Sequence, residues 1–436
     1  MMKKNRTIYF LLALVCLGLQ SCLFQEEDYF DDSSANRATA DVKRCSELLE
    51  AAPNGWVMEY YVGKDYSLGG ITLLCKFDGQ RVTMASQIAG ADETVSSLYS
   101  VKSEQATMLS FDTYNYLVHY FGQPQGSMAD DPNGTLGGDY EFVISDATAD
   151  RIELKGKKYG NRIVMKAFSA DQTWKQYLTR IKKVEDDAFF YEYDLRMDGL
   201  YTGQMLRSNY TFIVTYYDEV GKVYQKTVPF MFTTDGMRFH EPVTIDGQTM
   251  QNFVWKNEEI SFVCTDEGAT EVKLAGVYTA GYQSYDYYPG TYLMDFYRLN
   301  GATNQLEVAS QEIQLVKNED GKSYWLKGLE YDILVTYDKP RGGLSILPQF
   351  LKKVQGGYVY LAMWDLMNDY VLRSSAIGLI SYPTTDGIYL VDNGVWMGEI
   401  SGFIFGVYDS QDEEASFMGY TDAVAAIRLI KKTIEE

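Results

Sequence analysis

Apolar and polar residues alternate in many short stretches of the chain. In residues 71–77 the apolar residues of one strand face are Ile71, Leu73, Cys75 and Phe77. Asp78-Gly79 follows, a pair that tolerates the positive φ angles of a tight hairpin. Comparable stretches, rich in aromatic and β-branched residues, recur along the chain. This pattern predicts a mainly β protein.

Three stretches have helical spacing instead. Ser33 or Ser34 caps the first, and its apolar face consists of Ala38, Val42, Cys45 and Leu49. Asp171 caps the second, and its apolar face consists of Trp174, Tyr177, Leu178 and Ile181. Residues 113–121 predict a third, shorter helix. The charged run at 182–187 is a candidate domain boundary.

These elements predict two β domains. Residues 34–185 form an N-terminal antiparallel meander, either a barrel or a sandwich, with flanking helices. Residues 186–436 form a larger all-β C-terminal domain, with a further division near residue 275 as the alternative. Within it, residues 344–353 predict a helical turn, and residues 423–434 fit either a strand or a helix.

Residues 1–21 have the composition of a signal peptide. Three of the first six residues are positive, and residues 8–19 are an uncharged apolar run too short to span a bilayer. Ser21 stands directly before Cys22, an order that resembles the lipobox of bacterial lipoproteins. The resemblance implies cleavage before Cys22 and its acylation, whereas the alternative is an ordinary signal peptide. No later segment is apolar enough to predict a transmembrane helix.

Residues 22–33 then form an acylated, acidic tether. Gln25, Glu26, Glu27 and Asp28 resemble the export signal that sends Bacteroidetes lipoproteins to the outer leaflet of the outer membrane. A plain solvated acidic linker is the alternative. We expect an outer-membrane lipoprotein displayed at the cell surface.

The chain is strongly acidic. Its formal net charge of −21 over 436 residues becomes −24 once the three positive residues of the leader are removed. Such a chain repels phosphate backbones, which argues against a nucleic-acid partner. It also repels anionic lipid, so membrane attachment has to be covalent. The hydrophobic content of 46% predicts a packed core.

Three cysteines remain after the leader and the acylated Cys22, namely Cys45, Cys75 and Cys264. They have no CxxC spacing, so we expect small, buried, apolar residues. A disulfide between Cys45 and Cys75 is the alternative.

Blocks spread over most of the mature chain carry a family resemblance. They are Pro53-Asn54-Gly55-Trp56 with Glu59-Tyr60-Tyr61, Ser110-Phe111-Asp112-Thr113-Tyr114-Asn115, Gly138-Asp139-Tyr140-Glu141-Phe142, Leu154-Lys155-Gly156-Lys157-Lys158-Tyr159-Gly160-Asn161, Thr233-Thr234-Asp235-Gly236-Met237 and Phe253-Val254-Trp255. With the lipoprotein-like start, they resemble a Bacteroidetes family of surface lipoproteins that carry a domain of unknown function. The resemblance implies a neighbour of outer-membrane uptake systems that pair a transporter with a binding lipoprotein. It carries over no reaction and no catalytic residue.

Signatures of several enzyme classes are missing. His119 and His240 are the only histidines, and no HExxH, GxSxG or phosphate-loop motif occurs, so we predict no cofactor and no His-based metal site. The acidic loop at 130–134 lacks the twelve-residue pattern of a calcium loop and is expected to be a surface loop. A glycosidase with two carboxylates stays open, because acidic residues are abundant.

A tyrosine-rich loop is the candidate binding site. Tyrosine rings suit sugars and protein partners, but β proteins also use them as packing, and both alternatives stay open here for Tyr282, Tyr285, Tyr287 and Tyr288. The leading hypothesis is a non-enzymatic surface protein that binds a glycan or a peptide for an uptake complex with an outer-membrane transporter. A glycan hydrolase and an adhesive or structural surface protein are the alternatives.

Overall fold

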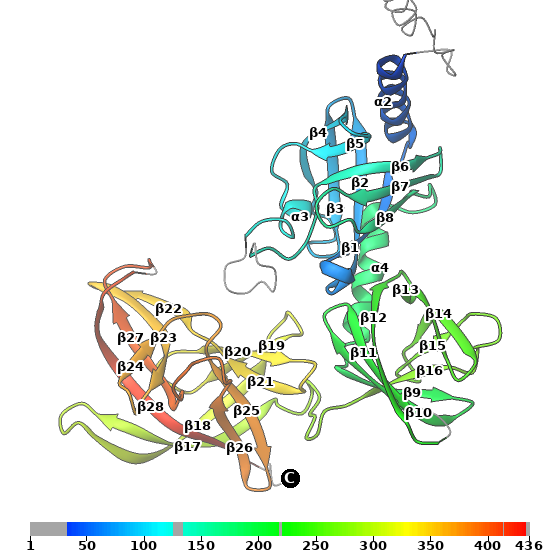
Figure 1. The fold of residues 1–436 in the computed structure, drawn as a ribbon. Helices are drawn as coiled ribbons and strands as arrows, with labels where there is room; N and C mark the ends of the chain where they lie inside the picture. Colours follow the sequence, from blue (N-terminus) through cyan, green and yellow to red (C-terminus); the bar gives the residue numbers. More distant parts are fainter. Residues whose placement is uncertain (1–32, 125–133, 218–219, 413, 433–436) are drawn as a thin grey trace, which may run out of the picture. The chain divides into compact units, whose positions relative to one another are not determined.

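The computed structural model describes residues 33–124, 134–217, 220–412 and 414–432. The protein is mainly β, with few helices, as the alternating pattern predicts (Figure 1). It divides into two compact units, residues 1–181 and 182–436. The predicted signal peptide, Cys22 and the acidic residues Gln25, Glu26, Glu27 and Asp28 lie outside the described residues.

The first unit contains a closed antiparallel barrel, so the choice between barrel and sandwich is settled in favour of the barrel. β1 pairs with β2 on one side and with β8 on the other, which closes the ring. The strands are β1 (Trp56–Val62), β2 (Gly69–Asp78), β3 (Arg81–Ser86), β4 (Val95–Ser103), β5 (Thr107–Phe111), β6 (Glu141–Ala147), β7 (Arg151–Gly156) and β8 (Arg162–Ala167), with a 3₁₀ turn, η2 (Lys64–Tyr66), after β1.

Side chains fill the interior of this barrel. The alternation in β2 is confirmed, since Ile71, Leu73, Cys75 and Phe77 are all buried. The interior also holds large rings, and Tyr60 and Phe111 each meet Phe142 edge to face at 6.1 Å between ring centroids. A barrel of this size has room for its own side chains.

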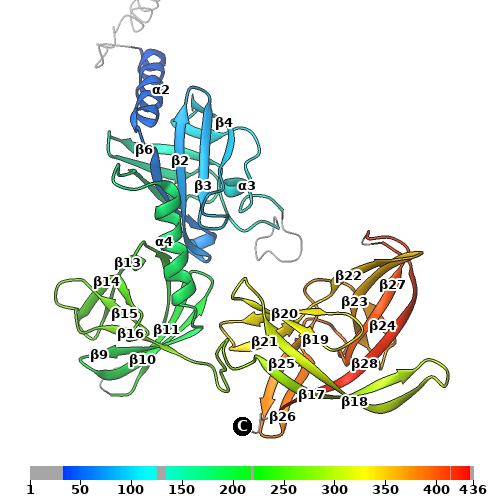
Figure 2. The ribbon, with the colours of Figure 1, turned by 180° about the vertical axis from the view of Figure 1, so that it is seen from behind.

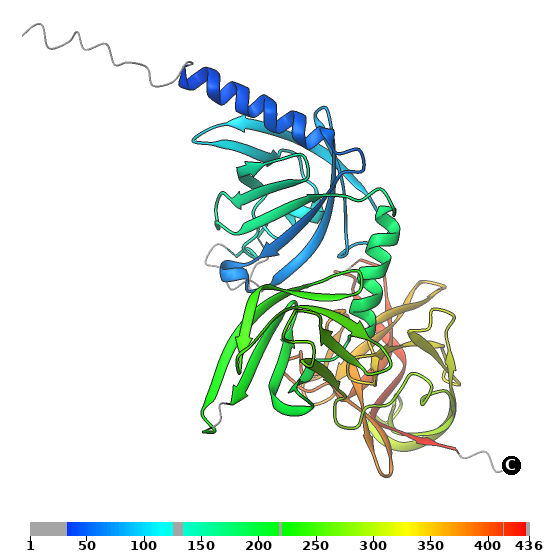
Figure 3. The ribbon, with the colours of Figure 1, turned by 90° about the vertical axis from the view of Figure 1, so that its right-hand side faces the viewer.

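Helix α2 (Ser34–Ala51) covers this barrel and follows the sequence prediction closely (Figure 3). Ser33 caps it, and its hydroxyl accepts from the Asn36 N–H at 3.2 Å. Cys45 and Leu49 are buried on the predicted face. The Trp56 indole donates to the Leu49 carbonyl at 2.8 Å, which joins the end of the helix to the start of β1.

The other two helices differ from their predictions. α3 (Tyr116–His119) is a single turn capped by the Asn115 side chain and is shorter than the expected 113–121. α4 (Trp174–Asp187) begins after Thr173, so the predicted cap at Asp171 is wrong.

Thr173 caps α4 through a reciprocal pair of contacts. Its hydroxyl accepts from the Gln176 N–H at 3.2 Å, and its own N–H donates to the Gln176 side chain at 2.9 Å. The helix then continues through the charged run, where Lys183 and Asp187 pair at 2.6 Å one turn apart.

The second unit begins with another closed antiparallel barrel. β9 pairs with β10 and with β16, which closes it. Its interior is rich in phenylalanine, with Phe212 and Phe230 stacked at 4.5 Å. The strands are β9 (Glu192–Met197), β10 (Leu200–Ser208), β11 (Thr211–Tyr217), β12 (Val223–Phe232), β13 (Gly236–Ile245), β14 (Gln248–Lys256), β15 (Ser261–Cys264) and β16 (Lys273–Val277).

The remaining strands form one sheet that closes on itself and also branches (Figure 2). β17 (Gly290–Asn300) pairs with β28 (Phe417–Lys431), which completes a ring through β18 (Gln305–Lys317), β19 (Ser323–Lys327), β20 (Ile333–Asp338), β21 (Gly343–Ile346), β25 (Leu379–Thr384) and β26 (Gly387–Asp392). The branch leaves β28 through β27 (Gly402–Tyr408) and β23 (Gly357–Asp365), and ends at β22 (Gln349–Val354) and β24 (Tyr370–Leu372). Figure 1 shows these branch strands side by side.

This sheet settles two predictions. The helical turn predicted over 344–353 is wrong, because these residues contribute the strands β21 and β22. The ambiguous tail is a strand, since β28 runs to Lys431.

The cysteines behave as small apolar side chains, as expected. Cys45, Cys75 and Cys264 are buried and free, so the alternative disulfide between Cys45 and Cys75 is not formed. In the described stretches between 33 and 432, no helix is both long and apolar enough to cross a membrane.

Candidate functional site: a cleft at Arg373

Two of the four predicted binding tyrosines belong to the core. Tyr288 is fully buried, and its hydroxyl donates to the Gly342 carbonyl at 2.8 Å. Tyr285 is half-buried, stacks on Tyr324 at 4.7 Å, and donates to the Ser323 carbonyl at 2.8 Å. A ligand cannot reach the Tyr288 ring, so the packing alternative applies to that residue.

The other two are more exposed but do not form a common surface with them. Tyr282 is half-buried, with its ring 4.5 Å from Tyr278, and it accepts a hydrogen bond from the Tyr337 hydroxyl at 3.1 Å. Tyr287 is 39% exposed, and the Lys431 ammonium lies 5.0 Å from its ring centre. The loop therefore offers isolated ring edges rather than one binding face, and its role in binding stays a prediction for Tyr282 and Tyr287.

A better-formed site lies on the branch of the C-terminal sheet. It is a cleft of about 650 Å³, larger than the hollows beside Trp174 and Trp325. Its walls come from β23, β24, β27, the start of β28, the segment after β24 and the loop between β27 and β28. It is lined by Tyr360, Val371, Leu372, Arg373, Ser374, Ser375, Tyr408, Gln411, Ala415 and Phe417.

Arg373 packs over the rings of two tyrosines in this cleft. Its guanidinium carbon lies 4.2 Å from the Tyr408 ring centre and 4.8 Å from that of Tyr360. Cations at such distances are attracted to the electron-rich ring face. The guanidinium also donates to the Asp412 carbonyl at 2.6 Å. Burial raises the pKa of Tyr408, and the Arg373 charge partly opposes that shift.

Four aromatic rings form a row across the branch. Phe350 on β22 meets Tyr360 on β23 at 5.4 Å, Tyr360 meets Tyr408 on β27 at 5.7 Å, and Tyr408 meets Phe417 on β28 at 5.5 Å. Phe350 and Phe417, at the two ends, are each 45% exposed. The row is thus accessible at both ends and covered by Arg373 in its middle.

Local sequence explains how the last two rings fit. A Cβ at Gly406 would come within 2.9 Å of the Tyr408 ring and 3.1 Å of the Phe417 ring, so glycine leaves their space open. The register between β27 and β28 also shifts at two points in this region. Such irregularities turn side chains away from their regular alternation.

Polar groups complete the cleft. Ser374, Ser375 and Gln411 are exposed along its rim and can donate and accept hydrogen bonds. No carboxylate side chain is among the described residues that line the cleft. The described lining therefore offers aromatic rings, hydroxyls, an amide and the Arg373 guanidinium.

Neither histidine lines the cleft. His119 packs on Tyr140 with 4.7 Å between ring centres, and its Nδ1 lies within hydrogen-bonding distance of the Asn115 main chain. His240 lies on β13. Among the described residues, no group of three His, Cys, Asp or Glu side chains is placed to hold a metal ion. Of the acidic loop at 130–134, residues 130–133 lie outside them.

The sequence contained only a weak signal for the cleft. Alternation along β23 places Tyr358 and Tyr360 on the face opposite Val359 and Leu361. Nothing local indicates Arg373, because its partners are 13 and 35 residues away along the chain.

Comparisons with known proteins place the chain in a family. Residues 26–257 match a domain of unknown function (DUF4302), and residues 265–404 match a second domain of unknown function (DUF4987). No curated protein matches the chain. The first match covers more than half of the 436 residues, and the chain therefore belongs to the DUF4302 family.

Proposed function

We propose that this protein is a lipid-anchored, outer-membrane surface protein that binds a glycan without transforming it, as a component of a nutrient uptake system. The leader and Cys22 support the anchor, and the acidic residues that follow support export to the outer surface. The resemblance to lipoproteins encoded near uptake systems supports the role in uptake. The Arg373 cleft is the observation that carries the binding function.

The cleft suits a sugar for physical reasons. A pyranose ring has apolar C–H faces and a polar edge of hydroxyls. Exposed aromatic rings such as Phe350 and Phe417 pack against such faces, and the hydroxyls and amide at the rim, from Ser374, Ser375 and Gln411, pair with the polar edge. The rings at both ends of the row are open, so a chain longer than one sugar has access.

Binding is favoured over hydrolysis at this cleft. Retaining and inverting glycosidases need two carboxyl groups about 5 to 10 Å apart around the scissile bond. The described lining contains neither of them. A peptide is the other ligand class that rings and hydrogen-bonding groups accommodate, and the same experiment separates the two.

The binding test uses the mature chain and a panel of soluble polysaccharides and peptides in native affinity electrophoresis. Phe417→Ala and Tyr360→Ala are expected to lose at least tenfold in affinity for the retarding polysaccharide, because each removes a ring from the row. Tyr382→Ala is the matched control, since Tyr382 is 62% exposed on β25, outside the cleft. Retardation by peptides alone, or unchanged binding in both cleft variants, would contradict the proposal.

The anchor is tested separately in cells. Cys22→Ser is expected to release the protein from the membrane fraction and to abolish labelling by a radioactive fatty acid. Neutralising Glu26, Glu27 and Asp28 is expected to keep the acylated protein in the membrane but protect it from protease added to intact cells. An acylated wild-type protein that resists protease while a known surface marker is cut would place it on the periplasmic side.

An exposed apolar surface favours a second role, docking to a partner protein. The outer faces of β10, β11 and β12 carry Tyr201 (53% exposed), Leu206 (41%), Ile213 (37%), Tyr217 (46%) and Val223 (56%). Leu206 pairs with Ile213 and Tyr217 pairs with Val223, and the polar row of Gln204, Thr215 and Gln225 lies between the two pairs. Exposed apolar side chains grouped in this way are typical of interaction sites. We assign this surface to the outer-membrane transporter of the uptake system. Val223→Lys is expected to abolish co-purification with the transporter, while Val308→Lys, at another exposed strand valine, leaves it intact.

A further inference from the structure

We infer that the Arg373 cleft selects an uncharged glycan and that the loop joining β27 to β28 repels polyanionic ones. This inference rests on the proposed function and adds the chemical class of the ligand. Three observations support it: the contacts that Arg373 makes in the cleft, the carboxylates at the rim, and the hydrogen bonds of two of those carboxylates.

Arg373 is the one cationic side chain among the described residues that line the cleft, and its position is structural. Its planar group lies against the rings of Tyr408 and Tyr360, and one of its nitrogens donates to the Asp412 carbonyl. A guanidinium that recognises a carboxylate presents two parallel N–H groups to it in one plane. In this cleft the flat group instead serves as a spacer between the two tyrosines and the loop after β27.

The rim carries the opposite charge. Asp409, Asp412 and Glu414 lie in the loop between β27 and β28, and all three are exposed. The same loop supplies Gln411 and Ala415 to the lining. A polyanion in the cleft would therefore pass close to several carboxylates, in a protein whose net charge is already −21.

Two of these carboxylates, those of Asp409 and Asp412, accept hydrogen bonds from the loop itself. The Asp409 carboxylate accepts from the Ser416 N–H at 2.9 Å, and that of Asp412 accepts from the Ser410 hydroxyl at 3.1 Å. Two main-chain bonds close the loop, from Ala415 N–H to the Asp412 carbonyl at 3.1 Å and from Asp409 N–H to the Ser416 carbonyl at 3.2 Å. The carboxylates of Asp409 and Asp412 thus have partners that hold them at the rim, where they repel an anionic ligand as it binds.

The test uses matched pairs of neutral and acidic polysaccharides with the mature chain. The pairs are hydroxyethylcellulose with carboxymethylcellulose, galactan with polygalacturonate, and dextran with dextran sulfate. In the pair that binds, the neutral member is expected to bind at least tenfold more tightly than the acidic one at low salt. The gap is expected to narrow in 0.5 M salt, where charges are screened beyond about 4 to 5 Å.

Two variants locate the effect. Asp412→Asn with Glu414→Gln is expected to tighten binding of the acidic member about fivefold and to leave the neutral member unchanged. Glu319→Gln with Glu399→Gln removes the same charge from exposed positions outside the lining and is expected to change neither. Both variants keep the size of the side chains, so the fold is retained.

The outcomes separate the inference from the proposed function. Equal binding of both members at low salt, or an equal response to the two variants, overturns the inference and leaves glycan binding in place. Binding of the acidic member alone also overturns it. If no member of any pair binds, the proposed function fails and the inference fails with it.

Discussion

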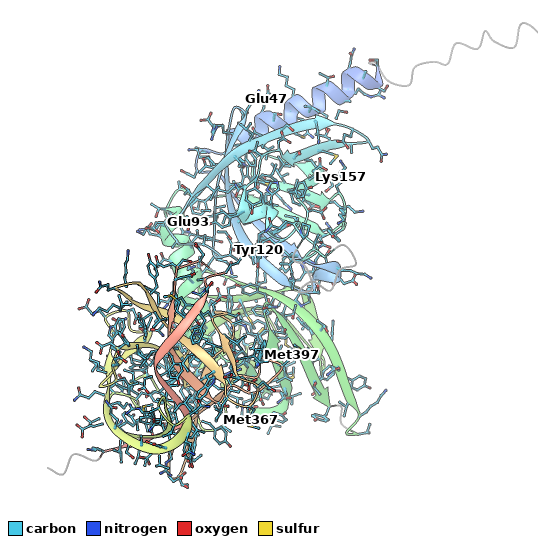
Figure 4. All side chains as sticks on the ribbon, turned by 90° about the vertical axis from the view of Figure 1, so that its left-hand side faces the viewer. Glu47, Glu93, Tyr120, Lys157, Met367 and Met397 are labelled. Atoms are coloured by element: carbon cyan, nitrogen blue, oxygen red, sulfur yellow. The ribbon has the colours of Figure 1, made fainter. Side chains whose placement is uncertain are left out.

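Gly156 and Asp139 are predicted to be coupled energetically across the first barrel. Asp139 is 6% exposed, and its carboxylate accepts from the Lys158 N–H at 2.7 Å and from the Tyr159 N–H at 3.1 Å. It thereby fixes the turn after β7, which Lys157 also holds through ion pairs of 3.0 Å to Glu104 and Glu141 (Figure 4 labels Lys157). A Cβ on Gly156 would overlap the Oδ2 atom of Asp139 and lie 2.7 Å from its Cγ.

The magnitude follows from these contacts. Gly156→Ala forces the carboxylate to move, and overpacking costs about 1 to 3 kcal/mol. The displaced carboxylate also weakens two hydrogen bonds to a charged group, each worth about 1.5 to 3 kcal/mol when lost entirely. We expect Gly156→Ala to cost about 3 kcal/mol, a sum of overpacking and partial bond loss.

The double variant reveals the coupling. Asp139→Ala removes the overlapping atoms and leaves its Cβ 3.2 Å from the new methyl group, a contact that small shifts relieve. In that background Gly156→Ala is expected to cost less than about 1 kcal/mol, which gives a coupling energy of about 2 kcal/mol. Gly90→Ala is the control, because its nearest neighbour would be 3.5 Å away and Gly90 has no positive φ.

Urea denaturation combined with amide hydrogen exchange of peptides from β6 and β7 measures these free energies within the first unit. Exchange restricts the readout to strands next to Asp139 and Gly156, so unfolding of the second unit does not contribute. If the free-energy costs of Gly156→Ala and Asp139→Ala add up to that of the double variant within about 0.5 kcal/mol, the two residues do not interact as described, and the assigned contact is wrong.

Three further predictions follow from single groups. Burial raises the pKa of Asp139, so the stability that comes from its protonated form is fully present below the unfolded value of about 3.9 and is lost as pH rises through the folded value, whereas the two N–H bonds to the ionised form remain. The stability difference between the wild-type protein and Asp139→Ala, measured by denaturation, should therefore be larger at pH 4 than at pH 7. Thr173→Ala removes the cap of α4 and should cost about 1 kcal/mol, seen as faster amide exchange in its first turn; unchanged exchange would contradict the cap. Burial raises the pKa of Cys264 to about 11. The thiols of Cys45, Cys75 and Cys264 should therefore resist alkylation in the folded protein at pH 8, but should react fully in denaturant without reductant. Rapid labelling of the folded chain, or incomplete labelling in denaturant, would count against three free buried thiols.

Local signals predicted most of the fold. The structure confirms signals that depend on residues close together in the sequence, namely the alternation in β2, the hairpin turn at Asp78-Gly79 and the apolar face of α2. The predicted cap at Asp171 was wrong because Thr173 and Gln176 pair reciprocally, so that the main-chain N–H groups of both residues have an acceptor. A lone aspartate does not satisfy both groups. The closure of each ring could not be predicted, because β1 meets β8 through residues more than 100 positions apart.

The sequence did not indicate the cleft at Arg373, because its residues also come together only through long-range strand pairing. A tyrosine-rich loop stands out in a sequence, but its tyrosines can also pack on the core, as Tyr285 and Tyr288 do against Tyr324 of β19. The cleft instead combines Tyr360, Arg373, Tyr408 and Phe417, one from each strand or loop, and Phe350 extends the row of rings beyond the lining. Only the pairing of β22, β23, β27 and β28 brings them together.

The position of the cleft follows from the way this fold uses its strands. Rings of strands close three times in the described part of the chain, and the interiors are occupied by the protein's own side chains. A ligand then has to bind on an outer face or at an irregular edge. The branch of β27, β23 and β22 lies outside the closed ring and packs one face on the common core. Its other face is covered in part by a second apolar cluster around Trp364, and the row of aromatic rings lies beside that cluster. The register shifts between β27 and β28 open that face locally, and the cleft at Arg373 lies where they occur.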